Sequence, residues 1–162
     1  MSKTTIAIVI PVFNVENYVE QTLESIKNQL SSPDEVIIIN DGSTDNSSQI
    51  INNYNNEEGW RIIHKNNEGL GLTRNYGRSI AKSEYIYFLD SDDIVKNNLI
   101  LRLREIIQQN NKPDMILFSG ETFNNENSFN TKINLKFSFQ GKYSRNNSLI
   151  TKLSKKNEIL PQ

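Results

Sequence analysis

The residues with the clearest chemical potential form an acidic cluster, Asp90-Ser91-Asp92-Asp93, directly after an apolar run. Its three carboxylates repel one another, and a divalent cation offsets that repulsion because Mg²⁺ and Mn²⁺ prefer hard oxygen ligands. Such metals take only a few protein carboxylates, and phosphates with water complete the shell, so a diphosphate is a natural partner. The cluster is equally typical of an exposed acidic turn that favours the N-terminus of the next helix. Taken alone, it supports both interpretations.

Two other segments carry residues suited to binding. The turn Asp41 to Asp45 contains Gly42, which can adopt a positive φ, and this turn would also serve simply to cap a following helix. The segment Asn66 to Asn75 places two glycines before a helix that bears Arg74. Backbone amides and a guanidinium there would suit an anion, although a plain loop explains the glycines as well.

The elements that must position these residues follow from hydrophobic patterning. Continuous apolar runs predict strands at Ile6–Ile10, Val36–Ile39, Trp60–His64, Tyr85–Leu89 and Met115–Phe118. Helix-period segments separate them. We expect Asn14 to cap the first helix and Ser43 or Thr44 the second. In the third, Leu72, Tyr76 and Ile80 are the expected buried stripe.

This alternation predicts an α/β domain with a mainly parallel sheet. In such sheets ligands bind beyond the carboxyl ends of the strands, and the polar segments described above all follow strands. After Ser119 the pattern decays. A loop at Asn124–Asn130, short strands within Lys132–Tyr143 and a short helix at Asn146–Leu153 are the expectations there.

The composition excludes several classes of protein. A net charge of -1 argues against a nucleic-acid partner. With 0 cysteines, disulfides and thiolate metal sites are excluded. No stretch approaches the ~20 apolar residues of a membrane span, and the start lacks the pattern of a signal peptide. We therefore expect a cytoplasmic protein.

Four segments follow one another along the chain: Ile8-Val9-Ile10-Pro11-Val12-Phe13-Asn14, Asn40-Asp41-Gly42-Ser43-Thr44-Asp45, Asn67-Glu68-Gly69 through Arg74-Asn75-Tyr76-Gly77, and Tyr87-Phe88-Leu89-Asp90-Ser91-Asp92-Asp93. In this order they resemble the inverting family 2 glycosyltransferases of the GT-A fold, a Rossmann-like three-layer architecture. The resemblance covers roughly residues 1–120, which we expect to be the nucleotide-sugar-binding core. Residues 121–162 would then begin the acceptor-side region, left incomplete.

The resemblance implies roles for individual residues. Asp41 would accept a hydrogen bond from the uracil N–H, and Asp92 would bind Mn²⁺ or Mg²⁺ within the family's Asp-x-Asp motif. Asp93 would orient the loop or cap the helix. The implied nucleotide-sugar contacts are Pro11, Phe13, Asn14, Glu16, Asp41, Arg74, Asp90 and Ser91.

The implied reaction is transfer of a hexosyl or N-acetylhexosaminyl unit from a UDP-sugar to a glycan or lipid-linked acceptor in polysaccharide biosynthesis. Inverting transfer also needs a general base, which in the family lies well beyond the Asp-x-Asp motif. Glu121, Glu126 and Glu158 sit in no recognisable base motif, so no base is assigned. His64, the sole histidine, is expected to be structural or exposed.

We therefore expect a piece of a larger transferase, whose remaining regions could attach it peripherally to the inner face of a membrane. The alternative is a short protein that binds a nucleotide sugar without transferring it, or completes its site through a partner. A metal-dependent nucleotidyltransferase would need a glycine-rich basic loop after the first strand, and Pro11 to Asn17 offers none.

Overall fold

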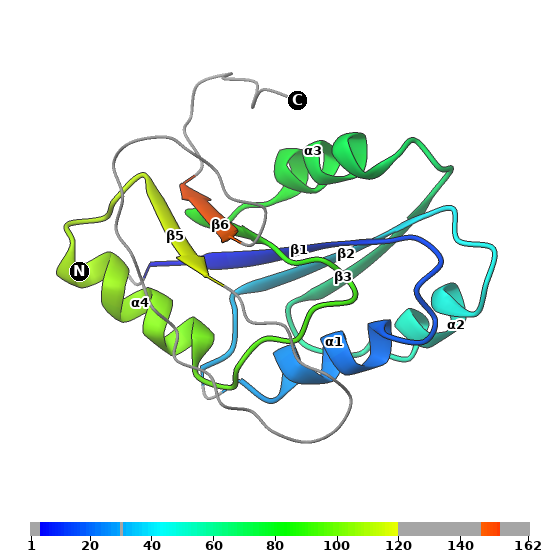
Figure 1. Cartoon of the computed structure of the whole chain (residues 1–162), viewed down its shortest axis with the longest axis horizontal. Helices are drawn as coiled ribbons and strands as arrows, with labels where there is room; N and C mark the ends of the chain where they lie inside the picture. Colours follow the sequence, from blue (N-terminus) through cyan, green and yellow to red (C-terminus); the bar gives the residue numbers. More distant parts are fainter. Residues whose placement is uncertain (1–3, 30, 120–146, 153–162) are drawn as a thin grey trace.

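The computed structural model describes residues 4–29, 31–119 and 147–152, in which a sheet lies between helices on both faces (Figure 1). The strands are β1 (Ile6–Val12), β2 (Glu35–Asp41), β3 (Trp60–Lys65), β4 (Tyr85–Phe88), β5 (Met115–Ser119) and β6 (Asn147–Lys152). The helices are α1 (Val19–Lys27), α2 (Ser47–Asn52), α3 (Leu70–Ile80) and α4 (Leu99–Gln109). The expected three-layer α/β class is confirmed.

The strand order is β3-β2-β1-β4-β6-β5. Strands β1 to β4 pair in parallel, whereas β6 runs antiparallel to both β4 and β5. The helix predicted for Asn146–Leu153 is therefore wrong over its described residues, because Asn147–Lys152 form β6. Its hydrogen bonds come from distant strands, and local periodicity does not reveal such pairing. The predictions for Asn124–Asn130 and Lys132–Tyr143 lie outside the described residues.

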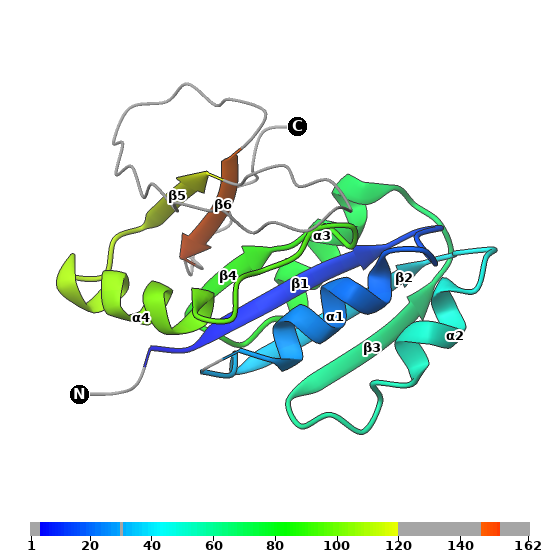
Figure 2. The same cartoon turned by 60° about the horizontal axis from the view of Figure 1, so that its bottom comes forward.

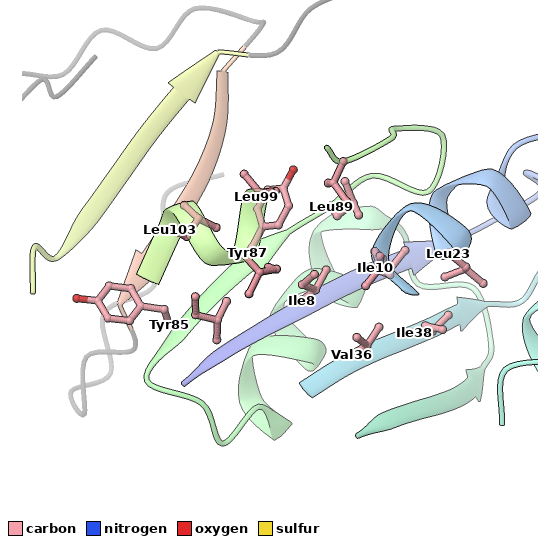
Figure 3. Packing of buried hydrophobic residues seen from close by; sticks show 14 of the residues in the cluster. Ile8, Ile10, Leu23, Val36, Ile38, Tyr85, Tyr87, Leu89, Leu99 and Leu103 are labelled. Carbon is pink, nitrogen blue, oxygen red and sulfur yellow. The ribbon is translucent and has the colours of Figure 1, made fainter. Parts of the chain in front are cut away.

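Strand β1 is buried along its whole length, so both of its faces contribute to the core. Ile8 and Ile10 face the larger cluster, which they share with α1, α2 and α4. Figure 3 shows Ile8 and Ile10 in the same cluster as Leu23 of α1 and Leu103 of α4. Ala7 and Val9 point to the opposite face, which α3 covers. Burying both faces explains the continuous apolar run, which predicted this strand correctly.

Helix α3 packs on the sheet through a different face from the predicted one. Thr73 and Gly77 are its buried residues, whereas Leu72 and Tyr76 are 57% and 42% exposed. A Cβ atom at Gly77 would lie 2.9 Å from Cδ1 of Ile39 and closer still to Val9. The helix therefore approaches the sheet through small residues, and Leu72 and Tyr76 face outward. Ile80, the third residue of the predicted stripe, is partly buried against the sheet.

The predicted helix caps are also wrong. Helix α1 begins at Val19 after Tyr18, and α2 begins at Ser47 after Asn46; neither has a side-chain cap. Asn14 instead adopts a positive φ of 51° in the loop before α1. Within the residues described, every helix is too short or too polar to cross a membrane.

Candidate functional site

The polar segments predicted from the sequence all follow the carboxyl ends of strands, on one side of the sheet. Because β1 to β4 are parallel, their carboxyl ends point the same way. The loops that follow β1 and β2 lie side by side, at the right in Figures 1 and 2. The acidic segment Asp90 to Asp93 follows β4, the strand next to β1. This is the edge where α/β sheets bind ligands.

Asp41, the last residue of β2, is buried, and both of its carboxylate oxygens accept hydrogen bonds. Its Oδ1 atom accepts hydrogen bonds from Lys65 Nζ at 2.5 Å and from the Glu68 backbone N–H at 3.0 Å. Its Oδ2 atom accepts one from the Gly69 N–H at 2.9 Å. Burial raises the pKa of Asp41, but these hydrogen bonds outweigh it and bring the pKa below its ordinary value. The result is a fixed, ionised acceptor.

Lys65 ends β3 directly opposite Asp41 in the parallel register. Its ammonium also contacts Glu68 Oε2 at 2.8 Å and donates to the Asn66 carbonyl at 3.0 Å. It thereby ties the loop after β3 to the end of β2. Sequence reasoning missed this residue, although its place at the end of a strand, like that of Asp41, was an available signal.

The loops after β1 and β2 are joined by reciprocal hydrogen bonds. Asn14 donates its backbone N–H to Ser43 Oγ at 3.1 Å and accepts from the Thr44 N–H at 2.8 Å. Glu16 donates its N–H to Asp45 Oδ2 at 3.0 Å and accepts from the Asn46 N–H at 2.8 Å. The side chains predicted to contact the nucleotide thus bind the neighbouring loop.

Other residues at this edge differ in how accessible they are. Pro11 is buried within β1, and Phe13 is 47% exposed just beyond it. Gly42 has a φ of 74°, and a Cβ there would lie 2.8 Å from the Asn67 backbone nitrogen. Only glycine therefore lets the β2 loop pass so close to the loop after β3.

The acidic segment after β4 is joined to α3. Arg74 of α3 forms an ion pair with Asp90, and Arg74 Nε is buried without a hydrogen-bond partner in the described part of the chain. Ser91 is buried, whereas Asp92 is exposed. Loss of solvent, followed by the charges of Asp92 and Asp90, raises the pKa of Asp93.

This donor set suits a hard divalent cation. Asp92 has an accessible carboxylate, and carboxylate oxygen is the ligand that Mg²⁺ and Mn²⁺ prefer. Among the residues described, no three or more of His, Cys, Asp and Glu are grouped to hold a metal ion.

His64 is exposed, as predicted. Its Nδ1 lies 3.1 Å from Asn40 Nδ2, and its Nε2 lies 3.0 Å from Asn52 Oδ1. The candidate bases Glu121, Glu126 and Glu158 lie outside the described residues.

A cavity of about 410 Å³ lies at the opposite edge of the sheet, beside Trp60 and Lys82. Glu35 in its wall accepts hydrogen bonds from Arg61, from the Lys82 backbone and from Ser83. None of the predicted site residues lines this cavity, so it is not the candidate site.

The chain is similar to bacterial glycosyltransferases. It is 38% identical over 106 residues to the uncharacterized glycosyltransferase EpsJ of Bacillus subtilis (strain 168), covering 65% of this chain and 31% of EpsJ. It is 39% identical over 106 residues to glycosyltransferase GlyG of Streptococcus pneumoniae, covering 64% and 35% respectively. The chain thus spans about a third of the length of these relatives.

A solved structure shares the fold. The structure of S. aureus TarS 1-349 in complex with UDP-GlcNAc matches with a TM-score of 0.69 and 26% identity, covering 77% of this chain and 37% of that one. The expected GT-A architecture is thereby confirmed. The glycosyl transferase family 2 model matches residues 7–158, which include all four segments gathered at the carboxyl edge. On this match and this fold, the chain belongs to glycosyl transferase family 2.

Proposed function

We propose that this domain binds a UDP-sugar together with Mn²⁺ or Mg²⁺, and that the enzyme transfers the sugar with inversion to a glycan or lipid-linked acceptor. The transferred unit would be hexosyl or N-acetylhexosaminyl, in polysaccharide biosynthesis. Residues 1–120 form the donor-binding core in this proposal, and residues 121–162 begin the acceptor side. The names of the relatives and the UDP-GlcNAc complex of TarS support a sugar-nucleotide donor.

One observation carries the proposal: the first turns of α3 connect the two acidic groups. The Gly69 N–H donates to Asp41, and Arg74 pairs with Asp90. The N-terminal part of α3 therefore contacts both the buried carboxylate of Asp41 and the acidic segment that begins at Asp90. A ligand with a hydrogen-bonding base at one end and a diphosphate at the other matches this arrangement.

At the base end, Asp41 acts as an acceptor. Hydrogen bonds from Lys65, Glu68 and Gly69 keep its carboxylate ionised and fixed in position. An ionised carboxylate is a strong acceptor for the uracil N–H. Phe13 and Pro11 would shape the pocket beside it. Asn14 and Glu16 would act here by fixing the loop that carries Phe13.

At the diphosphate end, Asp92 would hold the metal, with Asp90 and Ser91 beside the sugar and Arg74 near the phosphates. When bound, the metal would neutralise charge on the departing nucleoside diphosphate. The guanidinium of Arg74 already balances Asp90. This leaves the exposed Asp92 carboxylate to the cation.

Calorimetric titration of UDP into the chain, with and without Mn²⁺, tests the proposal. We expect Mn²⁺ to tighten binding, and Asp92→Ala to remove that gain. Asp41→Ala should weaken UDP binding about tenfold to a hundredfold, because a charged hydrogen bond is lost, and should reduce the preference for UDP over GDP. Glu58→Ala is the matched control, since Glu58 is exposed in the turn before β3, at the opposite edge.

Two results would contradict the proposal. One is a folded wild-type chain that fails to bind UDP in the presence of Mn²⁺. The other is a Mn²⁺ effect that survives in Asp92→Ala, which would place the metal elsewhere. Circular dichroism on each variant would verify that the chain is folded.

A further inference from the structure

A line of polar residues on α1 and just beyond it faces the interior. Thr22 is completely buried, Ser25 is half-buried and Gln29 is buried just past the end of the helix. Their spacing of three and four residues places them along one side of a helix. Buried polar groups are costly unless they are hydrogen-bonded, so this line requires partners.

Those partners are backbone groups of the segment that contains the acidic cluster. Thr22 Oγ1 donates to the Ser91 carbonyl at 2.9 Å, and the Val95 N–H donates to Ser25 Oγ at 3.1 Å. Gln29 makes two bonds to this segment: Nε2 donates to the Lys96 carbonyl at 2.7 Å, and the Ile100 N–H donates to Oε1 at 3.2 Å. The segment is thus held from within the acidic cluster to the start of α4.

The line is also ordered internally. The Ser25 hydroxyl donates to the Thr22 carbonyl at 2.7 Å, which leaves its lone pairs for the Val95 N–H. Gln29 Nε2 also donates to the Ser25 carbonyl at 2.9 Å. Each side chain therefore has its donor and acceptor roles fixed. The side-chain amide of Gln29 carries an NH₂ group that donates to both backbone carbonyls and an oxygen that accepts from a backbone N–H.

We propose that Thr22, Ser25 and Gln29 are positioning residues that hold the loop of Asp90 to Asp93 in the conformation that binds the metal and diphosphate. This inference rests on the proposed function. The three carboxylates of the loop repel one another, and Arg74 balances only Asp90 among them. The contacts from α1 hold the Ser91 backbone against that repulsion, so the loop does not need to be ordered by the ligand.

The test compares UDP affinity with and without Mn²⁺ in three variants and a control. Thr22→Val removes the hydroxyl but keeps the shape, and Thr22→Ser restores it. Gln29→Glu replaces the amide donor by an acceptor that faces the Lys96 carbonyl. Gln21→Glu makes the same change at an exposed position of α1 and is the matched control.

We expect Thr22→Val and Gln29→Glu to reduce the Mn²⁺-dependent gain in UDP affinity about 10- to 100-fold. Loss of a residue that positions a metal ligand usually has an effect of this size. Their metal-free UDP affinity should stay at the wild-type level, because Asp41 and its loop are untouched. Thr22→Ser and Gln21→Glu should retain the gain. Amide exchange at Val95 and Ile100 should quicken in Gln29→Glu without any ligand.

The outcomes separate the two hypotheses. A wild-type chain that shows no Mn²⁺ gain overturns the proposed function and this role with it. A wild-type gain that persists in Thr22→Val and Gln29→Glu overturns the positioning role alone. A parallel fall in metal-free and metal-dependent affinity also overturns it, since that pattern reports general destabilisation rather than control of the acidic loop.

Discussion

Asp41 at the end of β2 and Lys65 at the end of β3 occupy paired positions in the sheet, and their charged groups lie 2.5 Å apart. The Asp41 side chain is 4% exposed and that of Lys65 is 15% exposed. Water screens such a pair weakly, so the ion pair should influence both stability and the charge state of Asp41. This relationship links the base end of the proposed site to the packing of the sheet.

The pair has a definite pH dependence. The pKa of Asp41 is lowered from 3.8, so its contribution to stability is present above that pH and is lost as the pH falls through the folded-state value. Burial lowers the pKa of Lys65, but hydrogen bonds with Asp41 and Glu68 raise it above 10.5 overall. The Lys65 contribution is therefore present below 10.5 and is lost as the pH rises through the folded-state value.

Lys65→Met should lower the free energy of unfolding by about 3 kcal/mol at neutral pH, because it leaves Asp41 buried and unpaired. The difference from wild type should shrink at acidic pH, as the pH falls below 3.8 and through the lowered pKa of Asp41, because its carboxylate then becomes protonated. Urea denaturation at both pH values measures this. Lys112→Met breaks the exposed pair with Glu84 and should cost less than about 1 kcal/mol. An equal decrease in the free energy of unfolding in the two variants would contradict a larger contribution from the buried Lys65–Asp41 pair.

Gly77→Ala should destabilise the protein by about 1–3 kcal/mol, because the added Cβ would overlap Val9 and Ile39 in the sheet. Gly71→Ala is the control in the same helix, since a Cβ there meets nothing within 4 Å. That change should stabilise α3 by about 0.5–1 kcal/mol through helix propensity. Thermal unfolding of both variants measures the contrast, and a stabilising Gly77→Ala would mean that α3 does not approach the sheet so closely.

Asn14 combines a positive φ with two side-chain hydrogen bonds to Thr44. Asn14→Ala should lower the free energy of unfolding by about 2 kcal/mol, since it loses those bonds and keeps an unfavourable φ. Asn14→Gly loses the same bonds but accepts the φ, so it should be about 1 kcal/mol more stable than the alanine variant. The reverse order in denaturant titrations would exclude this backbone conformation.

Gly42 and Gly69 both have positive φ values, 74° and 90°, but differ in their surroundings. A Cβ at Gly69 meets nothing within 4 Å, whereas one at Gly42 would lie 2.8 Å from a backbone nitrogen. Gly69→Ala should therefore cost about 1 kcal/mol, from strain alone. Gly42→Ala should cost about 2 kcal/mol or more and should also weaken UDP binding. Comparable effects on stability and UDP affinity in the two variants would refute the close approach.

The sequence was sufficient to predict the elements that have a clear hydrophobic pattern of their own. The runs at β1 and β2 are continuous because both sheet faces are buried, and this pattern is readable without a structure. The face of α3 was not predictable in this way, because Gly77 contributes by being small rather than by being apolar. Strand β6 escaped prediction because its partners are far away in sequence.

The site shows the same division. The position of Asp41 and Asp90 at one edge follows from their place after parallel strands. The pairing of Lys65 with Asp41 depends on register between β2 and β3, and the partners of Thr22 and Gln29 depend on how α1 packs. Periodicity carries no information about register or packing angle.

The place of β6 between β4 and β5 bears on how the chain folds as it is synthesised. Strand β4 is complete at Phe88, but the strand that covers its open edge ends at Lys152. At about 5–20 residues per second, several seconds separate the two events during translation. Throughout that interval β4 is an edge strand next to the acidic segment, and unpaired edges invite association with other chains. The nascent protein should therefore be most prone to aggregation, and most dependent on chaperones, before residue 152 emerges.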